Sequence, residues 1–276
     1  MKAPTIFINI LSLASLYLAV SCNEEEQHDQ TVSTILATIE QSSTRTALDG
    51  PDADGVYKTI WSSDDAIAVF SGSNAASEFK LTSGANTNTA EFEGNAASDN
   101  MVAIYPYSIV KGRTGSTISV TLPEVQEYVS GNIPQGAYPM AAVSDGAVLP
   151  FYNLCSVLRL RMFGELTVKS ITFTPNDATV KTSGNATVNA GDKMLTMSGD
   201  AKSTVKLNCA NGVKLTRTST DFLMAVPAQK YTGGFTITIS TDQGAVVKAV
   251  KSDVTLSRSV LYPIEAFECK IDSKEN

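Results

Sequence analysis

Apolar and polar residues alternate along much of this chain, as they do in β-strands that bury one face. The alternation is strict in Phe235-Thr236-Ile237-Thr238-Ile239 and in Leu158-Arg159-Leu160-Arg161-Met162. No segment has the three- and four-residue apolar spacing of an amphipathic helix of average length. The pattern predicts a first group of strands at residues 31–39, 56–61, 66–70, 77–81, 89–93, 101–105 and 117–122. After residue 148 it predicts a second group, with strands at 168–174, 186–189, 194–197, 205–209, 213–217, 222–226, 235–240, 245–250 and 260–271.

Many short strands joined by Gly, Asn, Asp and Pro turns are typical of all-β sandwiches. A passage at residues 123–139 is rich in Pro and Gly and has no clear period. The turn at Asp145-Gly146 is the most natural boundary between the two groups. We therefore expect an all-β protein with an N-terminal β-sandwich domain at residues 32–146 and a C-terminal one at residues 147–276.

The N-terminus has the form of an export signal. Lys2 precedes an apolar run at residues 6–20, which is shorter than the ~20 residues of a membrane-spanning helix. Small residues then lead to Cys22, as in bacterial lipoprotein signals; an ordinary secretory peptide is the alternative. We expect residues 1–21 to be a signal peptide and Cys22 to carry a lipid that anchors the chain in a membrane. Residues 22–31 then form an acidic tether.

The composition argues against nucleic-acid binding. The formal net charge is −7, from 21 Lys and Arg against 28 Asp and Glu. An acidic chain without clustered basic residues lacks the electrostatic footprint of a nucleic-acid-binding protein. The length fits one large domain or two small ones.

The sequence holds a single histidine, His28, in the predicted tether. A Ser-His-Asp or Cys-His catalytic site within the folded region is therefore excluded, and so is a zinc site with a histidine ligand. Phosphate-binding and dinucleotide-binding motifs are absent. We expect no enzymatic activity and no cofactor.

Acidic residues cluster at two places, and in both the simplest use is a turn. Asp64 and Asp65 are adjacent, so in an extended segment they point to opposite faces and make a poor catalytic pair. The alternative at the other place is a partial calcium loop, which lacks the closing Glu and the flanking helices; its residues are Asp49, Asp52, Asp54 and Gly55. We expect turns and no metal.

Aromatic residues and cysteines remain as candidates for binding or reactivity. Trp61 lies in a predicted strand and is expected in the core. The tyrosines near the Pro/Gly-rich passage allow either a binding surface or loop packing; they are Tyr105, Tyr107, Tyr128 and Tyr138. Cys155, Cys209 and Cys269 permit at most one disulfide, and Cys209 alternates with apolar neighbours as a core residue does.

A set of short motifs in residues 44–175 resembles the fimbrillin family of surface lipoproteins, which includes the subunits of type V pili. The motifs are Thr44-Arg45-Thr46, Trp61 with Asp65, Ile67 and Val69-Phe70, Ala103 to Ser108, Leu122-Pro123 with Gln126 and Tyr128, Tyr138 to Ala142, Phe151 with Asn153-Leu154, Val157 to Leu160, and Val168 to Ile171. The final third matches only in its strand pattern.

The resemblance implies two tandem transthyretin-like (Greek-key) β-sandwich domains. It also implies cleavage between Arg45 and Thr46 by an arginine-specific protease, with loss of the first strand and its replacement by a strand from another subunit. We expect four apolar residues to leave the core with that strand: Val32, Ile35, Leu36 and Ile39. The alternative at Arg45 is an uncut strand end. The acidic run Glu24-Glu25-Glu26 resembles the tag that directs such lipoproteins to the cell surface; a solvated tether is the alternative.

Two functions follow from these expectations. The first is a structural or adhesive outer-membrane lipoprotein that becomes a pilus (fimbrial) subunit, with other pilus subunits as partners through strand exchange. Because the chain ends shortly after its last predicted strand, a minor, tip or accessory subunit is favoured. The second is a surface lipoprotein that is never cut and binds a glycan or a receptor on host or bacterial cells. The fate of Arg45 separates the two.

Overall fold

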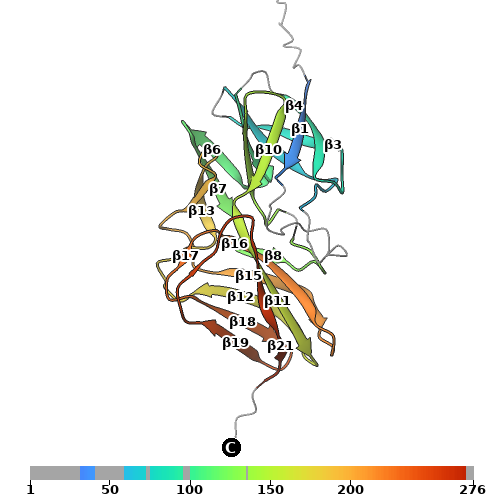
Figure 1. Ribbon diagram of the computed structural model, residues 1–276, viewed down its shortest axis with the longest axis vertical. Helices are drawn as coiled ribbons and strands as arrows, with labels where there is room; N and C mark the ends of the chain where they lie inside the picture. Colours follow the sequence, from blue (N-terminus) through green and yellow to red (C-terminus); the bar gives the residue numbers. More distant parts are fainter. Residues whose placement is uncertain (1–31, 41–58, 73–74, 96–99, 135, 272–276) are drawn as a thin grey trace, which may run out of the picture. The chain divides into compact units, whose positions relative to one another are not determined.

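The computed structural model describes residues 32–40, 59–72, 75–95, 100–134 and 136–271. Strands β1 to β21 dominate these residues, and the one helical segment among them is a 3₁₀ turn, η1 (Tyr107–Ile109). Figure 1 shows the strands gathered into several sheets. The predicted all-β class is confirmed.

Seven strands of the first half close into a barrel. Their order is β1-β10-β9-β5-β2-β3-β4, and β4 returns to pair with β1. The bounds are β1 (Val32–Ile39), β2 (Ala66–Ser71), β3 (Ser77–Ser83), β4 (Thr89–Asn95), β5 (Met101–Tyr105), β9 (Met140–Ser144) and β10 (Val148–Asn153).

A four-stranded sheet packs on the outside of this barrel. Its order is β14-β13-β7-β6, with β6 (Val110–Thr114), β7 (Thr117–Leu122), β13 (Gly184–Asn189) and β14 (Met194–Met197). Phe70 of β2, Ile104 of β5 and Tyr152 of β10 form a buried cluster with Ile118 and Val188 from this sheet. Strands covered on both faces read as continuous apolar runs, which is why β2 and β5 lack alternation.

The second half is a sandwich of two sheets. One has the order β19-β18-β12-β15-β8 and the other β16-β11-β21, and β17 with β20 forms a separate two-stranded sheet. The bounds are β8 (Val125–Glu127), β11 (Cys155–Gly164), β12 (Thr167–Pro175), β15 (Val205–Lys214), β16 (Thr220–Pro227), β17 (Lys230–Tyr231), β18 (Phe235–Thr241), β19 (Ala245–Val250), β20 (Val254–Thr255) and β21 (Leu261–Cys269).

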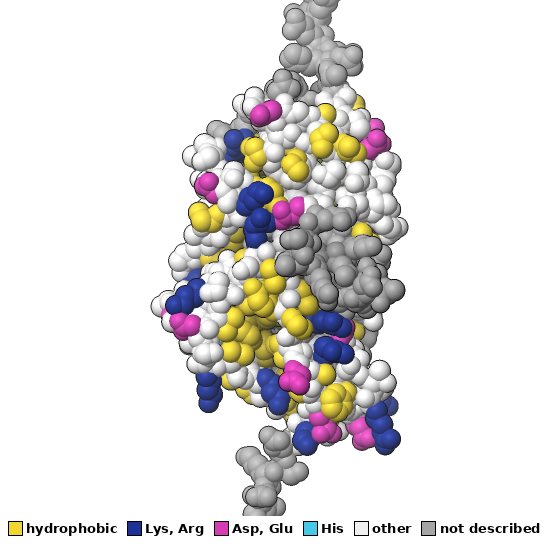
Figure 2. All heavy atoms as spheres, in the orientation of Figure 1, with side chains coloured by type: hydrophobic (Ala, Val, Ile, Leu, Met, Phe, Trp, Pro, Cys, Tyr) yellow, Lys and Arg dark blue, Asp and Glu magenta, His cyan; other side chains and the backbone are white. Residues whose placement is uncertain are grey.

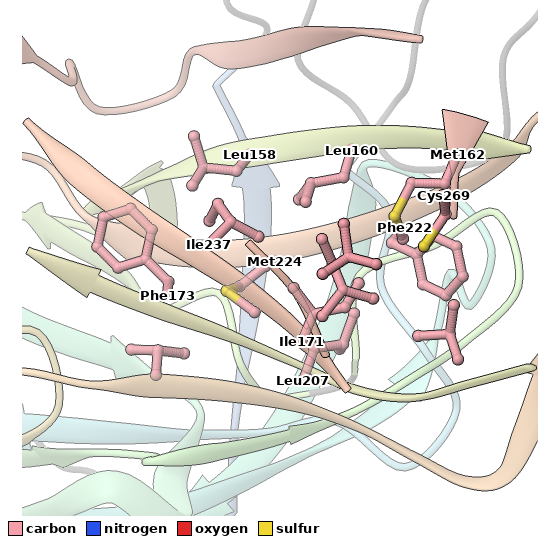
Figure 3. Packing of buried hydrophobic residues seen from close by; sticks show 14 of the residues in the cluster. Leu158, Leu160, Met162, Ile171, Phe173, Leu207, Phe222, Met224, Ile237 and Cys269 are labelled. Atoms are coloured by element: carbon pink, nitrogen blue, oxygen red, sulfur yellow. The ribbon is translucent and has the colours of Figure 1, made fainter. Parts of the chain in front are cut away.

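The core of this sandwich follows the predicted alternation. Figure 3 shows Leu158, Leu160 and Met162 of β11 in one buried cluster. The cluster includes side chains of the same sheet, such as Phe222, and of the opposite sheet, such as Ile171. The intervening Arg159 faces the other way and donates to the Asp221 carboxylate at 2.6 Å.

One buried polar side chain links the two sheets. The side-chain amide of Gln126 in β8 donates to the carbonyl of Ala225 in β16 at 2.7 Å and accepts from its N–H at 3.0 Å. These paired bonds explain a buried glutamine in a strand of three residues, since an unpaired buried amide is costly.

Most predicted strands are confirmed, and the differences have local causes. Trp61 and the described Ile60 lie outside any strand, because the chain there turns into β2. The predicted strand at 205–209 and the start of the one at 213–217 belong to one strand, β15, which shows a register shift against β12 and ends at Lys214; residues 215–217 lie after it. Strands β6, β8 and β9 were not predicted, since β6 and β8 carry few apolar residues and β9 lies beside the Pro/Gly-rich passage.

Strands cross the predicted boundary at Asp145-Gly146. β10, after the boundary, pairs with β1 and β9 of the barrel. β13 of the second half pairs with β7, and β8 of the first half pairs with β15. The division into residues 32–146 and 147–276 stays a prediction, with the two parts joined by shared sheets.

Candidate functional site

Strand β1 is the strand whose loss and replacement the resemblance implied. Its β-branched sequence favours an extended backbone, and period-two alternation buries Ile35, Ala37 and Ile39 at 2%, 0% and 3% exposure. Val32 and Leu36 point outward, with 63% and 37% exposure. The four apolar residues expected to leave the core with this strand were Val32, Ile35, Leu36 and Ile39; only Ile35 and Ile39 of these are buried.

β1 is hydrogen-bonded on both edges. It pairs antiparallel with β4 from Val32 opposite Asn95 to Thr38 opposite Thr89. On the other edge it pairs parallel with β10, with Leu36 opposite Val148 and Ile39 opposite Phe151. Without β1, the barrel would have two unpaired edges flanking an apolar slot.

The floor of that slot is a cluster of aromatic rings around Trp61. The indole lies edge-on to Phe92, Tyr105 and Phe151, with ring centroids 5.0, 5.5 and 5.3 Å away. Ile35, Ala37 and Ile39 belong to the same buried cluster. Trp61 is fully buried, so its prediction as a core residue is confirmed.

The acidic pair before β2 forms a turn, as predicted. The Asp65 carboxylate accepts from the Ser62 N–H at 2.7 Å and from the Tyr105 hydroxyl at 2.8 Å. Burial, together with the neighbouring Asp65 carboxylate, raises the pKa of Tyr105 well above its usual range. Asp64 is exposed. The two carboxylates therefore do not share a site, and Asp65 has a structural use.

The carboxyl end of β1 is held by residues from a distant part of the chain. The Glu40 N–H donates to the Phe151 carbonyl at 2.7 Å. Its side chain accepts from the Arg258 guanidinium and, at 2.9 Å, from the Ser259 hydroxyl. Arg258 also lies over the ring of Tyr152, 5.7 Å from its centroid, and burial raises the pKa of Tyr152 to about 12.

The four tyrosines near the Pro/Gly-rich passage do not form a common surface. Tyr105 and Tyr138 are buried, and burial raises the pKa of Tyr138 well above its usual range. Tyr128 packs against Phe222 at 5.0 Å between ring centroids, and Tyr107 is partly exposed. Packing explains three of the four.

The cysteines of the folded region are buried and unpaired. They are Cys155, Cys209 and Cys269. Burial raises the pKa of Cys155 to about 12 and that of Cys209 to about 11, so both thiols are protonated at neutral pH. Their position in the core agrees with the prediction for Cys209.

Within the described ranges, no group of three His, Cys, Asp or Glu residues is placed to hold a metal ion.

A hollow of about 770 Å³ lies beside β8, with Leu122, Val125 and Pro134 in its lining. Figure 2 shows basic and acidic side chains interspersed on the visible face, around a group of apolar side chains where β16, β11 and β21 lie. No helix in the described part of the chain is long and apolar enough to cross a membrane.

The sequence matches no protein-family model and no curated protein. Among solved structures it is similar to a proposed cell adhesion protein from Bacteroides ovatus, with 13% identity, TM-score 0.51, and coverage of 85% of this chain and 91% of that chain. A proposed cell adhesion protein from Bacteroides uniformis shows 14% identity, TM-score 0.48, and coverage of 86% and 94%. The tip fimbrial protein Mfa3 from Porphyromonas gingivalis, with a C-terminal truncation, shows 10% identity, TM-score 0.34, and coverage of 87% and 97%.

The likeness is one of fold. It rests on the Bacteroides ovatus structure, which has a TM-score of 0.51 and aligns with this chain over most of the length of both. That structure is described as a proposed cell adhesion protein, and its fold agrees with the fold that the resemblance implied.

Several predicted site residues lie outside the described residues. They are Cys22, Glu24, Glu25, Glu26, Arg45 and Thr46, and also His28, Asp49, Asp52 and Asp54. The contacts of Glu40, Arg258 and Ser259 were not predicted. A salt bridge between residues 218 positions apart leaves no local signal in a sequence.

Proposed function

We propose that this chain is a structural or adhesive protein of the cell surface: a minor, tip or accessory pilus subunit that assembles when β1 is exchanged for a strand from another subunit. The position of β1 carries the proposal. It is the first described strand, it pairs on both edges, and it is followed by the segment that contains Arg45.

The free energy that β1 contributes to the barrel is large enough for its loss to require a replacement strand. Burying a large apolar side chain is worth ~1.5–3 kcal/mol, so Ile35 and Ile39 together contribute about 3–6 kcal/mol. That is comparable to the net stability of a domain, ~5–15 kcal/mol. A barrel that has lost β1 therefore needs another strand, and one with the same apolar alternation fits the slot by β-augmentation.

The proposal includes delivery to the surface. A lipid on Cys22 would anchor the uncut chain in the outer membrane, and the acidic run at Glu24 to Glu26 would direct it outward. Cleavage between Arg45 and Thr46 would then separate the chain from both lipid and β1. The proposed role requires no enzymatic activity. Fold likeness to proteins described as cell adhesion and fimbrial proteins supports this reading.

One experiment tests processing and assembly together. Protein recovered from the surface of cells is expected to begin at Thr46 if it has assembled, and at lipid-modified Cys22 if it has not. In vitro, the chain beginning at Asn23 is treated with an arginine-specific protease and analysed by N-terminal sequencing and gel filtration. We expect a new N-terminus at Thr46 and oligomers, and an excess of a peptide with residues 31–40 should return the protein to monomers.

The control is Arg45→Ala, which should stay uncut at this position and monomeric. A monomer that has lost β1, remains folded and does not bind the peptide would contradict strand exchange. A surface protein that still begins at Cys22 would favour the uncut lipoprotein that binds a glycan or a receptor.

A further inference from the structure

Glu40 lies where the barrel meets the segment that contains Arg45. It directly follows β1 and is the last described residue before residue 59. Its N–H extends the pairing with β10 by a bond to Phe151. Any force that peels β1 out of the barrel from its carboxyl end must first separate Glu40 from its partners.

The partners of the Glu40 side chain, Arg258 and Ser259, belong to the loop between β20 and β21. Ser259 is only 6% exposed, has a φ of 59°, and donates its N–H to the Cys155 carbonyl at 2.9 Å. The next residue, Val260, accepts from the Val157 N–H at 3.0 Å. The loop is thus anchored on β11 of the second half before it reaches Glu40.

Arg258 is oriented by two contacts at once. Its guanidinium donates to the Glu40 carboxylate and lies over the Tyr152 ring in β10, the strand that pairs with β1. Charge-assisted hydrogen bonds are stronger than neutral ones, and a guanidinium over the face of an aromatic ring is also attracted by that ring.

We propose that Arg258 and Ser259 form a latch that holds the carboxyl end of β1 in the barrel, so that the second half of the chain regulates the release of this strand. The latch rests on the proposed function, because it controls the step that strand exchange requires. The proposed cleavage between Arg45 and Thr46 lies beyond Glu40 in the chain, so it leaves every contact of the latch in place. The incoming strand must therefore compete with a β1 that is still held at its end.

The side chains of Arg258 and Glu40 remain 34% and 28% exposed. Salt can therefore screen the pair, since the Debye length falls to about 3 Å at 1 M. Ionic strength should affect the opening of β1 more than the opening of strands buried at the centre of the sandwich. This selectivity separates a latch from a general contribution to stability.

The test is hydrogen–deuterium exchange of the uncut chain, followed by mass spectrometry. In Arg258→Met and in Glu40→Gln, amides of the peptide covering residues 32–40 should exchange about five- to thirtyfold faster, a change equivalent to one or two kcal/mol. Peptides from β12 and β18 should not change. The double variant should be no faster than the single ones, because the charged contact is removed only once.

Lys230→Met is the matched control. It breaks the 2.7 Å ion pair of Lys230 with Asp253, which lies in the same half of the chain and does not touch β1. It should leave exchange in residues 32–40 unchanged. In the unmodified chain, 1 M NaCl should accelerate exchange in residues 32–40, and this salt effect should be absent from the double variant.

Unchanged exchange in residues 32–40, or an equal rise in β12 and β18, would overturn the latch. If a variant does not fold, the salt series on the unmodified chain decides by itself: no selective acceleration of β1 overturns the proposal. None of these measurements needs cleavage or assembly. The latch can therefore fail while strand exchange stands, and strand exchange can fail while the latch stands.

Discussion

At the scale of single residues, the first half packs around one indole. Trp61 meets three aromatic rings edge-on, a geometry that favours contact between the positive ring edge and the negative ring face. One of these rings, Tyr105, also reaches Asp65. The same ring therefore supports the apolar core and satisfies a buried carboxylate at the turn into β2.

Tyr105→Phe tests this double role. The ring stays, but the Asp65 carboxylate loses a buried donor at 2.8 Å. Removing one partner of a buried hydrogen bond costs about 1–3 kcal/mol, so the free energy of unfolding should fall by that amount in urea denaturation. Tyr107→Phe, at a partly exposed ring, should change it by less than about 0.5 kcal/mol. Equal effects of the two substitutions would refute the structural role of Asp65.

At the scale of elements, β1 shows how strand period decides which side chains matter. Ile35, Ala37 and Ile39 are two positions apart and point inward. The expected set Val32, Ile35, Leu36 and Ile39 has helical spacing, whereas neighbours in a strand point to opposite faces, so Val32 and Leu36 face outward. Ala37 was overlooked because it is small, yet it is fully buried.

Alanine substitutions along β1 should show this alternation. Ile35→Ala should lower the free energy of unfolding by about 2–5 kcal/mol, because it leaves a cavity beside the aromatic cluster. Val32→Ala, at a position 63% exposed, should change it by no more than about 0.5 kcal/mol. Urea denaturation followed by tryptophan fluorescence measures both, since Trp61 is the only tryptophan. A larger loss for Val32→Ala would contradict the observed register.

At the scale of the whole molecule, the two halves share sheets. The hairpin of β13 and β14 extends the sheet that covers the barrel, and β8 completes a sheet of the second half. The latch at Glu40 is a third link. Loss of β1 from the barrel therefore bears on contacts made by residues more than halfway along the chain.

Val188→Ala tests the link through the hairpin. Val188 is fully buried in β13 and belongs to the same cluster as Phe70 and Ile104 of the barrel. The substitution should destabilise the protein by about 1–3 kcal/mol and accelerate amide exchange in β2 and β5. Thr187→Ala, whose side chain points to the other face of the same strand, is the control. Acceleration confined to residues 184–197 would show that the barrel does not depend on the hairpin.

Alternation and turn chemistry were enough to predict the all-β class and most strands, because each of these signals depends only on residues that are a few positions apart in the sequence. They also placed Trp61 and Cys209 in the core. The resemblance carried by motifs such as Trp61 with Asp65 pointed to a fold that the Bacteroides ovatus structure shares. For Gln126 and Asp65, the structure supplies a physical reason why those residue types stand there.

Only the tertiary structure decided how the strands join. That β1 lies between β4 and β10, that β13 pairs with β7, and that Arg258 reaches Glu40 are contacts between distant parts of the chain. Local sequence determines whether a segment is extended and which face is apolar. It does not determine which edge the segment meets, because every strand offers the same backbone donors and acceptors, and the choice among edges is made by the packing of the whole core.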